Sequence, residues 1–227
     1  ASFFKNRFGF DVTLYDVKSN DLIIPLPIDP ANGYGFKRIN AGEMRNKGIE
    51  AMVNITPVKN SNLTWDMSWN FTKNKNELVE LQGDLQNYIL TNAPFRVQLA
   101  AQVGYAYGQI LGTDFVYDAN GNKVVNSNGT YKASAIKPLG SILPDYNMGL
   151  RNTLRYKNLS LSFLFDMQEG GKYFSTSHMW GMYSGMLEET ALGGNREAGV
   201  ILPGVKADGS PNDVVLDAAD WGGSFYS

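Results

Sequence analysis

The stretch Leu63-Thr64-Trp65-Asp66-Met67-Ser68-Trp69-Asn70-Phe71-Thr72 alternates apolar and polar residues without an exception. Because successive side chains of a β-strand point to opposite faces, this segment has one hydrophobic and one hydrophilic face when it is extended. Leu, Trp, Met and Phe form the hydrophobic face, and Thr, Asp, Ser and Asn form the other. The pattern is typical of a strand that lies between lipid and a water-filled lumen.

Four further segments repeat this period of two. They lie near residues 7–17, 48–56, 146–156 and 159–168. Asn152 and Leu164 depart from the alternation in the last two segments. Together with 63–72, these segments predict about five long strands.

The connections between the predicted strands differ in length. Residues 57–62 and 157–158 are short links that predict antiparallel hairpins, whereas 18–47, 73–145 and 169–227 are long. Tight turns at one end of a sheet and long loops at the other are typical of outer-membrane barrels. Ten strand residues with a rise of about 3.3 Å and a tilt of about 45° span roughly 23 Å, close to the apolar band of about 25 Å in such barrels. We therefore predict an all-β fold. It is an antiparallel transmembrane β-barrel whose long loops are extracellular.

Composition excludes several classes of protein and of site. The chain has 227 residues, 43% of them hydrophobic, and a formal net charge of -2. It therefore lacks the excess of basic residues that is typical of proteins that bind nucleic acid. It has no cysteine, which rules out disulfides and thiolate metal sites. No stretch approaches 18 consecutive apolar residues, so a transmembrane helix is excluded, but a membrane strand needs only about 9–11 residues.

The sequence contains no convincing catalytic or metal-binding constellation. His178 is the only histidine, which is too few for a multi-histidine metal site, and it has no Ser-Asp pairing for a hydrolase triad. Glu188 and Glu189 are adjacent and point apart on a helix, whereas glycoside hydrolysis needs two facing carboxyl groups. The run 118–122 resembles the opening of a calcium loop, but Gly129 stands where the last carboxylate should be. We therefore predict no catalytic residue, no metal, no cofactor and no enzymatic activity.

Two loop segments have local signals of their own. Residues 115–125 place two short apolar runs around Asn120-Gly121, which predicts a small hairpin. Residues 177–192 carry apolar side chains near helical spacing, which predicts a short helix ended by Gly193-Gly194.

Several motifs resemble one protein family. The run Ile39-Asn40-Ala41-Gly42-Glu43-Met44-Arg45-Asn46-Lys47-Gly48-Ile49-Glu50, followed by a strand and a short turn, looks like a barrel signature of the SusC/RagA family of TonB-dependent outer-membrane transporters of Bacteroidetes. The run 139–158 resembles the late-barrel hairpin of that family, and 205–212 with 221–226 resembles a late extracellular loop. The resemblance spans nearly the whole chain.

This resemblance implies a function and a set of partners. Such transporters have a plug, a TonB-interacting segment and about 22 strands, so residues 1–227 are expected to be part of a single barrel domain, a C-terminal barrel fragment. The resemblance implies active import of glycan oligosaccharides or peptides across the outer membrane of a Gram-negative cell. It implies as partners the TonB complex, through a plug region absent here, a SusD-like surface lipoprotein and outer-membrane lipid.

The polar faces of the predicted strands provide candidate lumen-facing residues. They are Glu50, Asp66, Asn70, Arg151, Arg155 and Asp166. Polar lumen groups can replace part of the hydration of a solute, but they can equally solvate the barrel interior or anchor a plug. Two other classes remain open from the residues alone, a soluble β-sandwich carbohydrate-binding module and an outer-membrane enzyme.

Overall fold

The computed structural model describes residues 1–27, 29, 31, 33–40, 42–83, 85–94, 97–217 and 220. The chain divides into two compact units, each made of segments that are separate in the sequence. The first comprises Ala1–Tyr88, Ala101–Gly108 and Ser141–Lys172, and the second comprises Ile89–Ala100, Gln109–Gly140 and Tyr173–Ser227. Among the described residues, no helix combines the length and hydropathy that crossing a membrane requires.

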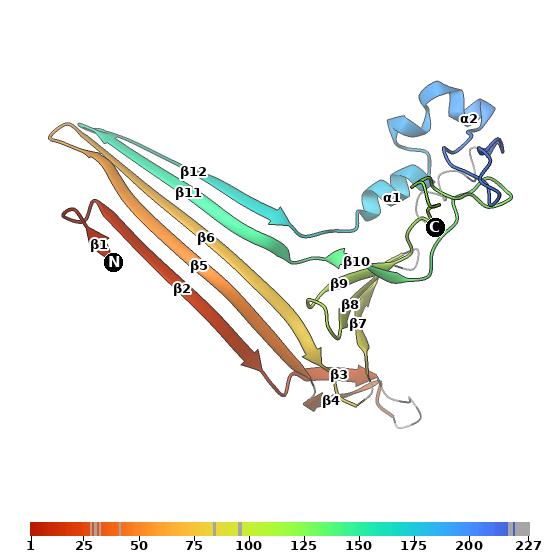
Figure 1. Ribbon diagram of the computed structural model, residues 1–227, viewed down its shortest axis with the longest axis horizontal. Helices are drawn as coiled ribbons and strands as arrows, with labels where there is room; N and C mark the ends of the chain where they lie inside the picture. Colours follow the sequence, from red (N-terminus) through yellow and green to blue (C-terminus); the bar gives the residue numbers. More distant parts are fainter. Residues whose placement is uncertain are drawn as a thin grey trace. The chain divides into compact units, whose positions relative to one another are not determined.

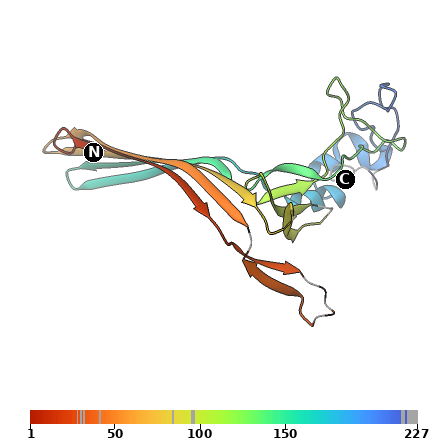
Figure 2. The same ribbon diagram turned by 60° about the horizontal axis from the view of Figure 1, so that its bottom comes forward.

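A six-stranded antiparallel sheet forms most of the first unit, in the order β1-β2-β5-β6-β11-β12 (Figure 1). Its strands are β1 (Ser2–Phe3), β2 (Phe8–Ser19), β5 (Glu43–Lys59), β6 (Leu63–Glu80), β11 (Pro144–Tyr156) and β12 (Leu159–Gly170). Figure 2 shows that these strands form one twisted layer. β1 and β12 are the edges, so the sheet is an open part of a barrel wall. The predicted antiparallel all-β fold is confirmed.

The register of the sheet places all the apolar sets of the strands on one face. Directly paired residues share a face in an antiparallel sheet. Trp69 of β6 pairs with Val53 of β5 and with Leu150 of β11, and Leu150 pairs in turn with Phe165 of β12. A slip of one residue in any strand would turn its apolar side chains to the polar face. The alternation in the sequence thus fixes both the faces and the register.

Strands β5 and β6 are longer than the alternation predicts. They contain 17 and 18 residues, whereas the predicted strands covered 48–56 and 63–72. The extension of β6 from Lys73 to Glu80 is mostly polar on both faces, so it lacks a period of two in hydrophobicity. Its pairing with β5 nevertheless continues, and Asn46 Oδ1 accepts hydrogen bonds from the Nδ2 groups of Asn74 and Asn76 at 3.0 and 2.9 Å. The predicted bounds of the loops at 18–47 and 73–145 are therefore wrong where they adjoin these strands, because β5 begins before residue 48 and β6 continues beyond residue 72.

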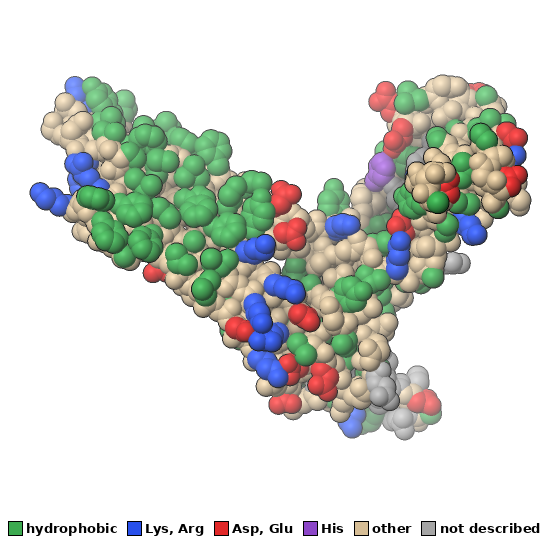
Figure 3. Space-filling model, in the orientation of Figure 1, with side chains coloured by type: hydrophobic (Ala, Val, Ile, Leu, Met, Phe, Trp, Pro, Cys, Tyr) green, Lys and Arg blue, Asp and Glu red, His purple; other side chains and the backbone are tan. Residues whose placement is uncertain are grey.

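The apolar face changes to a charged belt at the end of the sheet away from the short turns. The last apolar residues there include Leu14 and Ile49, and the next residues on the same face are Asp16 and Lys47. Arg45 donates two hydrogen bonds to the Asp16 carboxylate, at 2.8 and 2.6 Å. Figure 3 shows hydrophobic side chains gathered over this face of the sheet, with charged side chains beyond them. The apolar surface is thus a band with a defined limit.

Asn152, which breaks the alternation of β11, lies buried on the apolar face. Its Oδ1 accepts a hydrogen bond from Trp65 Nε1 at 3.2 Å. Since a buried polar group without a partner is costly, the indole N–H and the amide satisfy one another inside the band. The misfit in the sequence is therefore a paired polar contact and does not interrupt the strand.

The predicted loop segments contain further strands. A two-stranded hairpin is formed by β3 (Ile23–Pro27) and β4 (Phe36–Asn40). A four-stranded sheet has the order β10-β9-β8-β7. Its strands are β7 (Asn87–Asn92), β8 (Gln98–Gln102), β9 (Gln109–Gly112) and β10 (Lys137–Ser141). These strands are short and have no long alternating pattern, which is why the sequence gives no sign of them.

The second unit has its own small core, and its described residues include the α-helices α1 (Thr176–Tyr183) and α2 (Asn195–Ala198). Its core consists of Val125, Tyr131, Met182, Leu202 and Leu216. The helix predicted across 177–192 is shorter than expected. It ends before Gly185, whose φ is 71°, and Met186 N donates to Gly181 O at 2.8 Å while Gly185 N donates to Met182 O at 3.2 Å. These two bonds make a Schellman motif, so Gly185 ends the helix in place of Gly193-Gly194.

The side chain of Tyr15 lies over the backbone of Gly48, where a larger residue would have no room. Gly48 pairs with Tyr15 of β2, and a Cβ at Gly48 would meet the hydroxyl and ring of Tyr15. The same Cβ would lie 2.5 Å from the backbone oxygen of Lys73. The tyrosine ring can rotate away, but the carbonyl is held in the ladder between β5 and β6. The position therefore requires glycine.

We predict that Gly48→Ala destabilises the folded protein by about 1–3 kcal/mol, because the added methyl group overpacks against a fixed backbone oxygen. Urea unfolding of the full-length protein in detergent would measure the change. Gly35→Ala is the matched control, since a Cβ at Gly35 has nothing within 4 Å, and it should change stability by less than about 0.5 kcal/mol. Equal effects of the two substitutions would contradict the steric argument.

Candidate functional site: the polar face of the sheet

The six predicted lumen-facing residues all lie on one face of the six-stranded sheet. Asn70 pairs with Gly149, which pairs with Asp166, so these three strands share the face at this level. Glu50 pairs with Thr72, Arg151 with Ser68 and Arg155 with Thr64. Asp66 lies four residues before Asn70 in β6, so both side chains point to the same face. The fold thus brings together side chains from β5, β6, β11 and β12.

Asp66 is the centre of a polar network across three strands. Its Oδ1 accepts a hydrogen bond from Thr56 Oγ1 of β5 at 2.8 Å, and its Oδ2 accepts one from Arg155 of β11 at 3.1 Å. Both charged side chains are well exposed, so solvent screening limits the ion pair to less than about 1 kcal/mol. The network orients Arg155 and Asp66 and contributes little to stability.

The side chains of Glu50, Arg151 and Asp166 form no hydrogen bond or ion pair within the described part of the chain. Arg151 lies two residue pairs nearer to the short turns than Asn70, and Glu50 lies nearer to the other end. Their charges are available to water or to groups that approach this face. A charged group on a surface of this kind can attract or repel a solute before any contact is made.

Apolar side chains interrupt the polar face at several positions, among them Leu164 and Met52. Leu164 pairs with Arg151, and Met52 pairs with Asp11 and Asn70. Both side chains are exposed. Leu164 is recognisable in the sequence as a break in the alternation of β12, whereas Met52 stands at a polar position of β5. The face therefore offers small apolar contact points as well as charges.

Three turns of the second unit are built alike. They span 117–123, 125–131 and 205–211, and an antiparallel bridge joins the first and last residue of each. In each turn a glycine in the left-handed region, with φ of 84°, 86° and 83°, follows Asn or Asp. The first is the predicted Asn-Gly hairpin, which the structure confirms. The other two were missed, although Asn128-Gly129 and Asp208-Gly209 carry the same signal.

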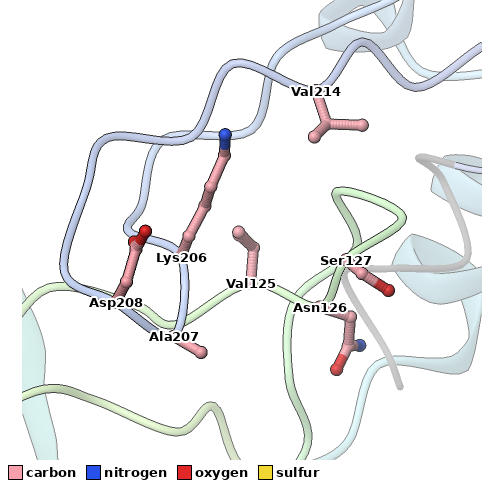
Figure 4. Close-up of a pocket in the computed structure, with 7 residues that line it drawn as sticks. All are labelled: Val125, Asn126, Ser127, Lys206, Ala207, Asp208 and Val214. Atoms are coloured by element: carbon pink, nitrogen blue, oxygen red, sulfur yellow. The ribbon is translucent and has the colours of Figure 1, made fainter.

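A pocket of about 290 Å³ lies between the second and third of these turns (Figure 4). Its lining residues are Val125, Asn126, Ser127, Lys206, Ala207, Asp208 and Val214. Lys206 Nζ is engaged by Asp213 Oδ1 at 2.6 Å. Hydrogen bonds from the hydroxyl and the backbone N–H of Ser210 lower the pKa of Asp208 below its usual range. The pocket thus has valine and alanine walls and one carboxylate that stays ionised.

His178 has an acidic neighbour, Glu189. Its Nε2 lies 3.6 Å from Glu189 Oε1, and both side chains are about half exposed. Among the described residues, no group of three or more His, Cys, Asp or Glu side chains is placed to hold a metal ion. The predicted absence of enzymatic activity stays a prediction.

The strands that carry this polar face match a known family. The profile described as TonB dependent receptor-like, beta-barrel matches residues 1–184. The chain belongs to the TonB-dependent receptor family. The members it resembles are transporters or receptors of the outer membrane, and the SusC/RagA-like assignment from the motifs is confirmed.

Individual relatives of this TonB-dependent receptor chain cover most of it. TonB-dependent receptor P3 of Formosa agariphila is 30% identical over 196 residues, 76% of this chain and 20% of that protein. TonB-dependent receptor SusC of Bacteroides thetaiotaomicron is 31% identical over 180 residues, 71% of this chain and 17% of that protein. The solved RagAB peptide transporter has the same fold, with a TM-score of 0.67 at 24% identity over 80% of this chain and 21% of that chain. The chain spans about a fifth of the length of these relatives.

We predict that the two faces of β6 respond differently to substitution. Asp66→Asn, Arg155→Gln and their combination should each change the free energy of unfolding by less than about 1 kcal/mol, because the pair is solvated. Trp65→Ala is the matched control on the opposite face of the same strand, and it should cost about 1–3 kcal/mol because it leaves the buried Asn152 amide oxygen without its donor. Urea unfolding in detergent measures all four variants. A loss for Asp66→Asn as large as that for Trp65→Ala would contradict the assignment of faces.

Proposed function

We propose that this chain forms part of the barrel wall of an outer-membrane importer, energised through TonB, that takes up glycan oligosaccharides or peptides. The polar face of the sheet, with Glu50, Asp66, Asn70, Arg151, Arg155 and Asp166, lines the lumen. The apolar band faces lipid, and the segments near 18–47, 73–145 and 169–227 carry the extracellular loops, with residues 221–227 outside the described part. The chain contributes no bond chemistry.

One observation carries this proposal: the apolar face of a single-layer sheet is exposed. Leu14 of β2 is 75% exposed and Phe165 of β12 is 64% exposed, and these strands lie toward opposite edges of the sheet. In a soluble β-sandwich this face would pack against a second sheet, whereas the described residues of the first unit place no second sheet over the six-stranded layer (Figure 2). An exposed apolar surface of this extent on a β-sheet is stable when lipid covers it. The observation therefore favours a membrane wall over a carbohydrate-binding sandwich.

The relatives support the direction of transport and the partners. SusC and P3 are named TonB-dependent receptors, and RagAB is named a peptide transporter. By analogy, the partners of this protein are the TonB complex, reached through a plug region, and a SusD-like lipoprotein over the extracellular loops. Charged and polar side chains on the lumen wall suit hydrophilic oligosaccharides and peptides alike.

The full-length protein should sediment with outer membranes and require detergent for extraction. Cells that produce it should take up a labelled oligosaccharide or peptide mixture, and an uncoupler that abolishes the proton gradient should stop this uptake, because TonB relays that energy. Deletion of the gene is the matched control. Uptake that persists with the uncoupler, or a protein that stays in aqueous buffer without detergent, would contradict the proposal.

A further inference from the structure

The charged belt at the end of the apolar band contains five basic side chains on the apolar side of the sheet. The register continues the rows of this face, since Leu14 pairs with Ile49 and Ile49 pairs with Lys73. The next two rows consist only of charged residues, which are Asp16, Lys47 and Lys75, and then Lys18, Arg45 and Glu77. Figure 3 shows lysine and arginine side chains gathered where the hydrophobic surface ends. The belt thus adjoins the apolar band directly.

Carboxylates hold two of the five basic groups in close ion pairs. Arg45 donates two hydrogen bonds to Asp16, at 2.8 and 2.6 Å, and Lys18 Nζ lies 2.6 Å from Glu43 Oε2. The other three basic groups are lysines that follow one another across β5 and β6. We call Lys47, Lys73 and Lys75 the lysine triad.

The lysine triad has more distant partners. Lys47 Nζ lies 3.5 Å from Asp16 Oδ2, an oxygen that already contacts another basic group. Lys75 Nζ lies 3.9 Å from Glu77 Oε2, and its side chain is 78% exposed, so water screens this pair. Lys73 is exposed and forms no ion pair with any described residue. The positive charge of the triad is therefore only partly neutralised by the protein.

The sheet brings the charges of the triad close to one another. Lys47 and Lys75 are directly opposite on neighbouring strands, and Lys73 precedes Lys75 on the same face of β6. Like charges at opposite positions of a sheet destabilise it. An anion beside the ammonium groups removes this repulsion, and lysine is a common ligand of phosphate.

Stacked and tilted aromatic rings mark the end of the apolar surface beside the triad. The Phe71 ring centroid lies 5.9 Å from that of Trp69 and 5.6 Å from that of Tyr146. Phe71 precedes Lys73 on the same face of β6. Tryptophan and tyrosine rings gather at the level of the headgroups where a protein crosses a bilayer. With lipid over the apolar band, the triad lies at the level of the lipid phosphates.

A hollow of about 350 Å³ lies beside two lysines of the triad. Lys73, Lys75 and Leu143 are among its lining residues. Asp145 also lines it, but its carboxylate is directed to Gly170, where a Cβ would lie 2.5 Å from Asp145 Oδ2. The hollow therefore offers room for an anionic group next to the two ammonium groups.

We propose that the lysine triad binds the anionic phosphate of a lipid headgroup while the acyl chains of the same lipid lie over the apolar band. The inference rests on the proposed function, in which lipid covers that band. The triad is continuous with an exposed apolar surface, so one amphipathic molecule matches both, whereas a free anion or an acidic protein matches only the charge. Lysine side chains near the end of a membrane segment commonly extend their ammonium groups to the headgroups.

Fluorescence quenching tests lipid binding at the triad itself. The full-length protein carries Ile49→Cys as its single cysteine, labelled with bimane, because Ile49 pairs with Lys73. It is placed in phosphatidylcholine vesicles that contain a small fraction of phosphatidylglycerol or phosphatidylcholine with a nitroxide on the acyl chain. Labelled phosphatidylglycerol should quench bimane at least about threefold more strongly, because its headgroup carries a net negative charge. Equal quenching by the two lipids would overturn the proposal.

Substitutions within the triad identify the groups that cause the preference. Lys73→Gln with Lys75→Gln should abolish the stronger quenching by phosphatidylglycerol, and Lys73→Arg with Lys75→Arg should retain it. Lys37→Gln with Lys132→Gln is the matched control, since both lysines are exposed and lie outside the belt, and it should leave the preference unchanged. A preference that survives the triad glutamine variant would overturn the lipid site. Loss of the preference when inorganic phosphate replaces chloride at equal ionic strength would overturn it in favour of a free anion.

The outcomes separate this proposal from the proposed function. TonB-dependent uptake by a folded protein without a preference for phosphatidylglycerol would overturn the lipid site and leave the importer standing. A bimane label that neither nitroxide lipid quenches would contradict the membrane wall itself. A preference that depends on the triad, in a protein without energised uptake, would support the lipid site and contradict the importer alone.

Discussion

The structure depends on one constraint: every strand must satisfy its backbone hydrogen bonds with its neighbours while its side chains face two different environments. Lipid offers no donor or acceptor, so a spanning sheet must pair all its backbone groups internally. The ladders between neighbouring strands from β2 to β12 do this with only local register shifts, and the outer edges of the open sheet lie outside them. With the backbone satisfied, the period of two decides which environment each side chain meets. The apolar band and the polar face are consequences of that single arrangement.

The departures from the alternation show how the constraint is met locally. Asn152 enters the apolar band only because Trp65 supplies a donor to it. Gly48 makes room for the Tyr15 side chain and keeps β5 close to the Lys73 carbonyl. Leu164, in contrast, lies exposed on the polar face. The first two preserve the ladder and the band, whereas the third changes the chemistry of the wall.

The sequence predicts those strands whose two faces differ sharply in polarity. The segment 63–72 reveals its strand because Trp65 and Asp66 belong to an unbroken alternation of apolar and polar residues, and the placement of the six candidate residues on one face follows from the same parity. Residues 73–80 continue the strand in a region that is polar on both sides, so hydrophobicity carries no signal there. β7 to β10 are too short to show a period. Gly185 and Gly193 both adopt the left-handed conformation, so α1 ends at the glycine whose neighbours form the Schellman bonds, and composition alone does not distinguish the two.

Accessibility of single cysteines along residues 63–72 tests the account most directly, because this chain has no cysteine of its own. Each position is replaced in turn in the full-length protein, labelled with a nitroxide and examined in lipid vesicles with oxygen and with a water-soluble nickel chelate. A wall between lipid and lumen predicts a period of two, with labels at positions 65, 67 and 69 relaxed by oxygen and labels at positions 66, 68 and 70 relaxed by the nickel chelate. Equal accessibility of both sets to the nickel chelate would contradict a wall between lipid and lumen.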